Sequence, residues 1–146
     1  MASKKRIRIL FSTLILYFLV SCSNPINRIN FQPTPDLSGT YLINLTDEYF
    51  NIGRIINVRI AERNFEEIKN LLREMVIVVG KIKNQPVSPK YGNAKKLLGE
   101  ALWLDSFSIL MMIEGMPKED YESTFFDGAA KYAEYVSEMR TLGHQP

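Results

Sequence analysis

The sequence predicts an all-α protein, an up-down antiparallel bundle of four helices that follows a disordered tether. Two observations support this fold class. Apolar residues recur every three or four positions through most of residues 46–146, which is the period of helices that bury one face. Proline and glycine collect in short connections, and short connections make successive helices antiparallel neighbours. A bundle of three helices, with one long first helix, is the alternative.

The tether is predicted to cover residues 22–45, and the bundle domain residues 46–146. Pro25, Pro33 and Pro35 lie in the tether among several Asn and Ser residues, a composition typical of loops. Its last six residues, TYLINL, suit a short extended stretch. One domain is expected, because the remaining chain has the size of a single small domain.

The first helix is predicted to begin at Thr46. This residue suits an N-cap, and Asp47 and Glu48 place negative charge in the first turn, where the helix dipole favours it. Leu45 and Phe50 occupy the two positions of a hydrophobic staple, which fixes the direction in which the chain enters a helix.

Two apolar stripes then compete for the same helix. One follows a heptad and comprises Val58, Ala61, Phe65, Ile68, Leu72, Met75, Val79 and Ile82. The other comprises Ile52, Ile56 and Ile60 and lies on the opposite face. A single straight helix would therefore expose one of the two stripes in its first half.

A break near Asn64 removes this conflict. Asn64 and Glu67 have the spacing of a capping box, although Asn replaces the usual Ser or Thr. We therefore favour two helices, at about 47–62 and 65–83. No Gly or Pro marks the break, so one continuous helix stays open as the alternative.

The remaining helices are bounded by proline and glycine. The connection NQPVSPKYGN covers residues 84–93, and the third helix is predicted over 94–113. Gly115 suits a helix C-terminus, and Pro117 suits the first turn of a fourth helix that runs to about Leu142. This fourth helix has a regular apolar stripe of Tyr121, Phe125, Ala129, Tyr132, Val136 and Met139.

The third helix carries apolar residues on more than one face. Trp103, Phe107, Leu110 and Met111 fall on or near the side that carries its charged residues, Lys96, Glu100 and Glu114. One interpretation is a central helix that is buried on nearly all sides. The other is a partner-binding patch, because Trp, Phe and Met are enriched in the cores of protein interfaces.

Asp105 is the candidate buried polar residue. It points into the core stripe of the third helix, and a buried carboxylate is costly unless it is paired or hydrogen-bonded. A functional interpretation makes it an acid with a raised pKa, or a ligand. The structural interpretation is a hydrogen bond to Ser108 or Tyr132, or partial exposure of the helix.

Residues with the spacing of a catalytic site are not found. The single histidine, His144, follows Gly143 at a helix end that is expected to fray, so no Ser–His–Asp or Cys–His arrangement is predicted. Zinc ligands and a Gly-rich phosphate loop are missing from the sequence. We therefore predict a protein that is not an enzyme and that has no metal site and no cofactor.

The first residues are basic, then apolar, then small, and then comes a cysteine. MASKKRIR is followed by the uncharged run ILFSTLILYFLV, which is shorter than the roughly 20 apolar residues of a membrane-spanning helix. Leu19, Val20, Ser21 and Cys22 match a lipobox. Residues 1–21 therefore resemble the signal peptide of a bacterial lipoprotein, with Cys22 as the lipidated residue.

This resemblance implies cleavage before Cys22 and diacylglycerol on its sulfur, often with a third acyl chain on the new amino terminus. Two chains anchor a protein stably, whereas one chain does so only marginally. In the lipoprotein sorting scheme of enteric bacteria, Ser23 in place of Asp favours the outer membrane over the inner one. A signal anchor, or a secreted chain with an incidental cysteine, is the alternative.

The charge of the mature chain argues against nucleic acid as a partner. The full chain has 18 Lys and Arg residues against 16 Asp and Glu, and the loss of four basic residues with the signal peptide leaves 14 against 16. The basic excess that binds phosphate backbones is therefore absent from the mature sequence. Cys22 is the only cysteine, so the domain has no disulfide and depends on apolar burial.

These observations together predict a membrane-anchored adaptor or structural binding module in the bacterial cell envelope. Its expected partners are the membrane, through the lipid on Cys22, and another envelope protein, through the patch on the third helix. The alternative is a helical bundle that binds a small apolar ligand, such as a lipid or a tetrapyrrole, lined by Tyr121, Tyr132 and Tyr135.

Overall fold

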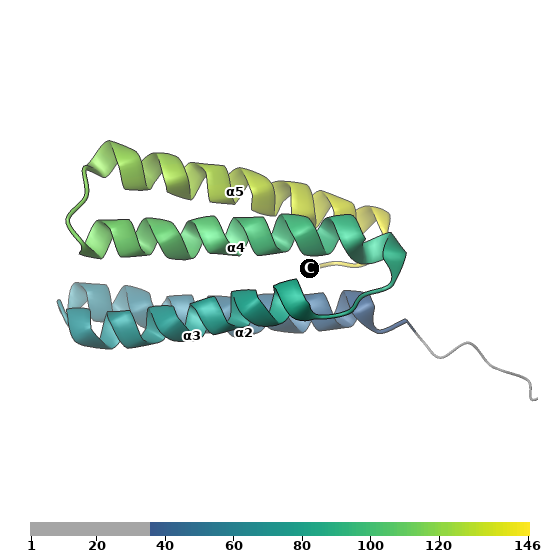
Figure 1. Ribbon diagram of the computed structural model, residues 1–146, viewed down its shortest axis with the longest axis horizontal. Helices are drawn as coiled ribbons and strands as arrows, with labels where there is room; N and C mark the ends of the chain where they lie inside the picture. The colour runs from purple at the N-terminus through teal and green to yellow at the C-terminus, as the bar shows by residue number, and fades with distance from the viewer. Residues whose placement is uncertain (1–35) are drawn as a thin grey trace, which may run out of the picture. The chain divides into compact units, whose positions relative to one another are not determined.

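The computed structural model describes residues 36–146, which form an all-α bundle of four antiparallel helices (Figure 1). The helices are α2 (Ser38–Ala61), α3 (Phe65–Asn84), α4 (Gly92–Ile113) and α5 (Lys118–Thr141), with a short 3-10 helix, η1 (Pro89–Tyr91), before α4. The four-helix prediction is confirmed, and the three-helix alternative is wrong. The predicted signal peptide, Cys22 and the first part of the tether lie outside the described residues.

Helix α2 begins at Ser38, so the prediction of a start at Thr46 is wrong. Leu42 and Tyr49 are fully buried and continue one apolar face through Thr46, which is itself 4% exposed. The Thr46 hydroxyl donates to the carbonyl of Leu42 at 2.8 Å, a bond typical of a helix interior. Residues 36–45 therefore belong to the folded domain, and neither a tether nor an extended stretch is present there.

The chain turns between α2 and α3 without Gly or Pro. Arg63 adopts φ 57°, a left-handed conformation that residues with a side chain rarely take. Asn64 then caps α3, which begins at Phe65. The predicted break at Asn64 is therefore confirmed. It lets the isoleucine stripe of α2 and the part of the heptad from Ile68 onward face the same core, whereas Val58 and Ala61 are exposed on α2.

The core runs along the whole bundle and receives side chains from all four helices. Its largest fully buried members are Leu42, Tyr49, Ile56, Ile68, Met75, Ile82, Tyr91, Leu98, Leu102, Tyr135 and Met139. The predicted heptad is confirmed only from Ile68 onward, where Ile68, Leu72, Met75, Val79 and Ile82 are all buried. Its first three members, Val58, Ala61 and Phe65, are exposed.

The predicted apolar stripe of α5 is confirmed only in its second half, where Met139 is buried and Tyr132 and Val136 pack against the core. Phe125 is 47% exposed and Ala129 is exposed, whereas Gly128 and Tyr135 are buried. Gly128 brings α5 close to α4, because a Cβ at this position would lie 3.1 Å from the carbonyl oxygen of Ala101. At Gly128 the two helices therefore lie too close for a larger residue, while Phe125 and Ala129 lie outside the core.

Candidate functional site

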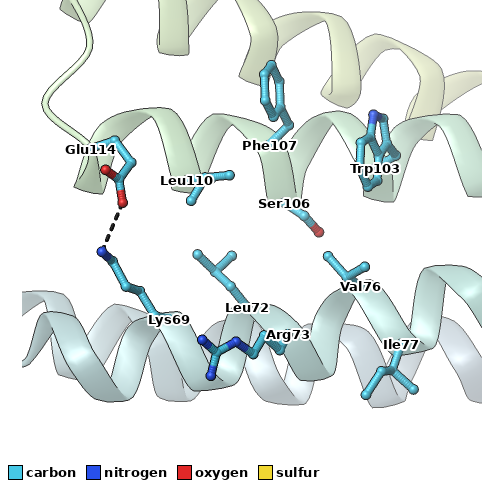
Figure 2. A pocket seen from close by; sticks show the side chains of 10 residues that line it. All are labelled: Lys69, Leu72, Arg73, Val76, Ile77, Trp103, Ser106, Phe107, Leu110 and Glu114. Atoms are coloured by element: carbon cyan, nitrogen blue, oxygen red, sulfur yellow. Dashed lines mark ion pairs between the residues drawn. The ribbon is translucent and has the colours of Figure 1, made fainter.

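Helices α3 and α4 enclose an apolar groove of about 390 Å³ (Figure 2). One stripe of side chains comes from each helix, at the spacing of three and four residues that keeps them on one face. The α3 wall consists of Lys69, Leu72, Arg73, Val76 and Ile77. The α4 wall consists of Trp103, Ser106, Phe107, Leu110 and Glu114.

Three of the four predicted partner-binding residues lie in this groove and are open to solvent. Trp103, Phe107 and Leu110 are 45%, 43% and 40% exposed. The rings of Trp103 and Phe107 lie nearly parallel, with centroids 6.4 Å apart. The interpretation of α4 as a helix buried on nearly all sides is therefore wrong for these residues.

The fourth predicted residue, Met111, does not join the groove. It is partly buried, and the hydroxyl of Thr124 on α5 lies 3.7 Å from its sulfur. Its neighbour in the sequence, Leu110, points into the groove instead (Figure 2). The two residues differ because adjacent helical positions are rotated by about 100° from each other.

The sequence analysis missed Val76 and Ile77, which form the exposed apolar part of the α3 wall. They are 43% and 60% exposed. The run of five apolar residues at 75–79, MVIVV, could have indicated them. Five consecutive residues point to all sides of a helix, so some of them must lie outside the core. Met75, Val78 and Val79 are buried in the bundle, and the other two point outward.

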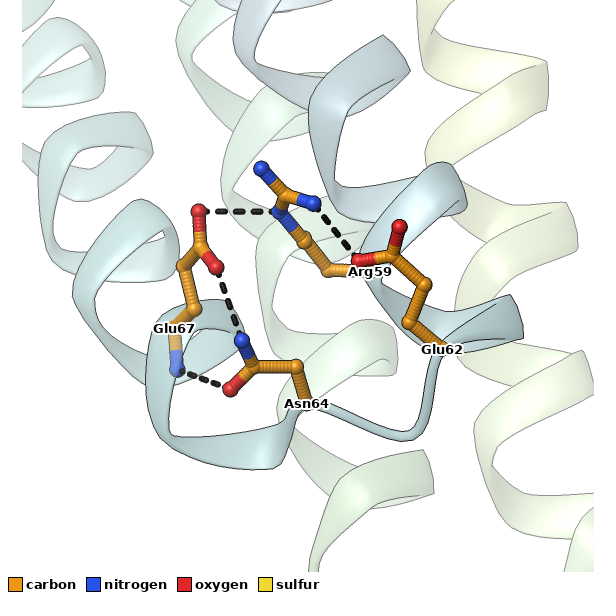
Figure 3. Close-up of polar contacts among 4 residues, drawn as sticks. All are labelled: Arg59, Glu62, Asn64 and Glu67. Atoms are coloured by element: carbon orange, nitrogen blue, oxygen red, sulfur yellow. Dashed lines mark hydrogen bonds and ion pairs between the residues drawn. The ribbon is translucent and has the colours of Figure 1, made fainter.

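The start of the α3 wall is held in place by polar contacts around Asn64 (Figure 3). The Asn64 side-chain oxygen accepts from the backbone N–H of Glu67 at 3.3 Å, and its amide donates to the Glu67 carboxylate at 2.8 Å. The guanidinium of Arg59 pairs with both Glu62 and Glu67, at 2.6 and 2.8 Å. These contacts connect the end of α2 to the first turn of α3.

The charges around the groove are unevenly divided between its two walls. Lys69 pairs with Glu114 across one end at 3.0 Å (Figure 2). Arg73 donates to Asn70 at 2.8 Å, and the ammonium of Lys83 lies 5.2 Å from the centroid of the Trp103 ring. Within residues 36–146, neither Arg73 nor Lys83 has a carboxylate partner. The α3 side of the groove is therefore positively charged.

Asp105 on α4 does not line the groove, and its carboxylate is hydrogen-bonded to Tyr49 of α2. The Tyr49 hydroxyl lies 2.9 Å from the Asp105 carboxylate, 2.7 Å from the Ser106 hydroxyl and 2.8 Å from the Leu102 carbonyl. The expected side-chain bond to Ser108 or Tyr132 is therefore wrong. Ser108 donates instead to the backbone carbonyl of Asp105, at 2.8 Å.

Burial changes the acid–base behaviour of this polar cluster. It raises the pKa of the half-buried Asp105 above its ordinary value, and the hydrogen bond from Tyr49 partly opposes the change. Burial also raises the pKa of Tyr49, which therefore stays a neutral phenol at physiological pH. The Asp105 carboxylate therefore accepts a hydrogen bond within the bundle and is half-buried, so the expected partial exposure is confirmed.

A cavity of about 200 Å³ borders Asp105 on the side of α5. It is lined by Phe50, Ala101, Leu102, Asp105, Phe125, Gly128, Ala129 and Tyr132, and its open surface is apolar. Sites for drug-sized ligands usually enclose about 300–1,000 Å³, so this cavity is small for a lipid or a tetrapyrrole. Of the tyrosines predicted to line a ligand site, only Tyr132 borders it.

Replacing Asp105 by asparagine is expected to change how stability depends on pH. Because the folded state raises the pKa of this carboxyl, its protonation stabilises the fold. That contribution is complete below the unfolded pKa of about 3.9 and is lost as the pH rises through the folded value. The unfolding free energy of wild type minus that of Asp105→Asn should therefore fall as the pH rises above about 4, as urea titrations would measure. A difference independent of pH would contradict this expectation.

His144 does not lie at a frayed end, in contrast to the prediction. Its Nε2 lies 2.6 Å from the hydroxyl of Tyr91, and a Cβ on Gly39 would overlap its ring. The histidine therefore ties the end of the chain to the starts of α2 and α4. Within residues 36–146, no group of three or more His, Cys, Asp or Glu residues is arranged to hold a metal ion.

Comparison with known proteins finds no match for this chain among family models, curated proteins or solved structures. Across residues 36–146, no helix combines the length and the apolar character that crossing a bilayer requires.

Proposed function

We propose that this protein is a membrane-anchored, non-catalytic adaptor that binds another envelope protein through the groove between α3 and α4. The observation that carries the proposal is the exposure of Trp103, Phe107, Leu110, Val76 and Ile77 along one continuous groove. Exposed apolar surfaces of this kind mark interaction sites, and aromatic anchors dominate binding energies. The only carboxylate of the groove is already paired, so the groove offers contact area rather than reactive groups.

The anchor is proposed from the N-terminal sequence. The lipobox at Leu19–Cys22 supports lipidation of Cys22, and Ser23 favours the outer membrane over the inner one. Helix α2 begins at Ser38, so only a short stretch of chain separates the lipid from the bundle. A partner bound in the groove would therefore be held near the membrane surface.

The groove is tested by replacing Trp103 and Phe107 together by alanine. Hot-spot aromatics contribute about 2 kcal/mol or more each, so recovery of the partner should fall at least about tenfold. The measurement is affinity capture from detergent-solubilised envelopes of the host, with the captured proteins quantified by mass spectrometry.

The matched control is Phe126→Ala, because Phe126 is 65% exposed on α5 and lies outside the groove. The control should capture the same proteins as the wild type. Equal recovery of every protein with the double variant would overturn the groove as the docking site.

A further inference from the structure

We infer that the groove binds an amphipathic helix whose apolar ridge is flanked by carboxylates on the side that faces α3. The inference rests on the proposed function, since it gives the chemistry of the partner segment that the adaptor would bind.

The dimensions of the groove suit a helix. Its α4 wall runs from Trp103 to Glu114, which is about 16 Å along the axis and about three helical turns. The apolar residues of both walls follow helical spacing. Ridges of this kind can pack against a third helix, with about 8–10 Å between the helix axes. A partner with apolar residues at positions i, i+3 or i+4, and i+7 would fill the groove along its length.

The hydrogen bonds of the groove also favour a helix over an extended segment. An extended chain would need partners for its backbone N–H and C=O groups. Ser106 is the only hydroxyl in the walls, and it already bonds to the Leu102 carbonyl and the Tyr49 hydroxyl. A helix satisfies its own backbone bonds, so it can lie on apolar walls without leaving polar groups unpaired.

The charges give the partner helix a preferred side. Lys69 and Arg73 of α3 line the groove, and Lys83, also on α3, lies over the ring of Trp103 at the edge of the groove. The acid Glu114 caps the end of α4. Lys69 and Glu114 neutralise each other, which leaves Arg73 and Lys83 about 15 Å apart along α3. Carboxylates on the α3-facing flank of the bound helix would meet both cations, which orients the helix and speeds its association.

The test uses the fluorescence of Trp103, which is the only tryptophan in the chain. Two synthetic helical peptides without tryptophan share the same leucine ridge, and they carry either glutamates or lysines along one flank. Each is titrated into the purified full-length protein in a non-ionic detergent, which treats both charges alike. We expect the glutamate peptide to shift the emission of Trp103 to the blue and to bind about tenfold tighter than the lysine peptide.

A variant with reversed charges tests whether the preference for the glutamate peptide comes from the cations at the groove. Arg73→Glu combined with Lys83→Glu should make the lysine peptide the tighter ligand. The matched control, Lys118→Glu combined with Arg140→Glu on α5, makes the same change in net charge away from the groove. This control should keep the preference for the glutamate peptide.

Three outcomes would overturn the inference. Binding of neither peptide would exclude a helix as occupant, and equal or tighter binding of the lysine peptide by the wild type would exclude an acidic one. An emission shift that depends only on protein concentration would assign the groove to a second copy of the chain. Each outcome differs from failure of the adaptor proposal, which the envelope capture with the Trp103 and Phe107 variant decides separately.

Discussion

Replacing Tyr49 by alanine is expected to lower the free energy of unfolding by about 4 kcal/mol. The side chain is fully buried, and its ring packs edge-on against Phe50 with centroids 5.7 Å apart. The truncation creates a cavity between α2 and α4. It also removes the hydroxyl that contacts the carboxylate of Asp105 and the hydroxyl of Ser106.

The magnitude follows from two separate losses. Deleting a buried aromatic side chain costs about 3–5 kcal/mol through lost apolar contact and the cavity that remains. A buried polar group that loses its partner adds about 1–3 kcal/mol, although water that enters the cavity would reduce this second cost. The free energy of unfolding of a small domain is only about 5–15 kcal/mol, so the variant should still fold but with little stability left.

Urea unfolding followed by circular dichroism would measure the effect. Tyr49→Phe is the matched variant, because it keeps the ring and removes only the hydroxyl, and it should cost about 1–3 kcal/mol. Phe50→Ala removes a ring that is 39% exposed and should cost less than Tyr49→Ala. If Tyr49→Ala and Tyr49→Phe both cost less than 1 kcal/mol, Tyr49 does not join α2 to α4 as the contacts indicate.

Replacing Cys22 by serine is expected to move the protein from the membrane fraction to the supernatant. The change removes the sulfur that would carry diacylglycerol, and each buried CH₂ of an acyl chain contributes about 0.8 kcal/mol of membrane binding. Residues 36–146 contain no helix suited to span a bilayer and to replace that anchor. If the lipid is the anchor, attachment of the mature chain should therefore depend on this one residue.

Growth with radiolabelled palmitate, followed by fractionation of the cells, tests this prediction. The wild-type protein should be labelled and should sediment with membranes. The Cys22→Ser protein should be unlabelled and should stay in the supernatant. Ser21→Ala is a suitable control, since it keeps a small residue before the cysteine. A wild-type protein that stays unlabelled and remains in the supernatant would refute the lipid anchor.

The helices were largely predictable because their signals are local. The period of the apolar residues predicted the helical fold and the core face of α3, and the Asn64–Glu67 spacing predicted the break before it. These features depend on neighbours within one turn of the chain. The start of α2 was not predictable in this way, because the burial of Leu42 by other helices outweighs the capping signal at Thr46.

The candidate site was predictable only in part. The apolar residues on the charged face of α4 indicated Trp103, Phe107 and Leu110, but they did not indicate Val76 and Ile77 across the groove. Periodicity tells which residues of one helix share a face, and it does not tell which helix covers that face. The partner of Asp105 was missed for the same reason, since Tyr49 lies 56 residues away in the chain.

The sequence by itself determined the helical class, the position of most helix boundaries and the lipobox that predicts an anchor at Cys22. Only the tertiary structure decided that α3 and α4 leave a groove open, that Met111 turns toward α5 and that Asp105 meets Tyr49. The physical reason is the range of the interactions. Helix formation and capping are decided within a few residues, whereas burial and pairing depend on the rotation and close approach of helices that are distant in the chain.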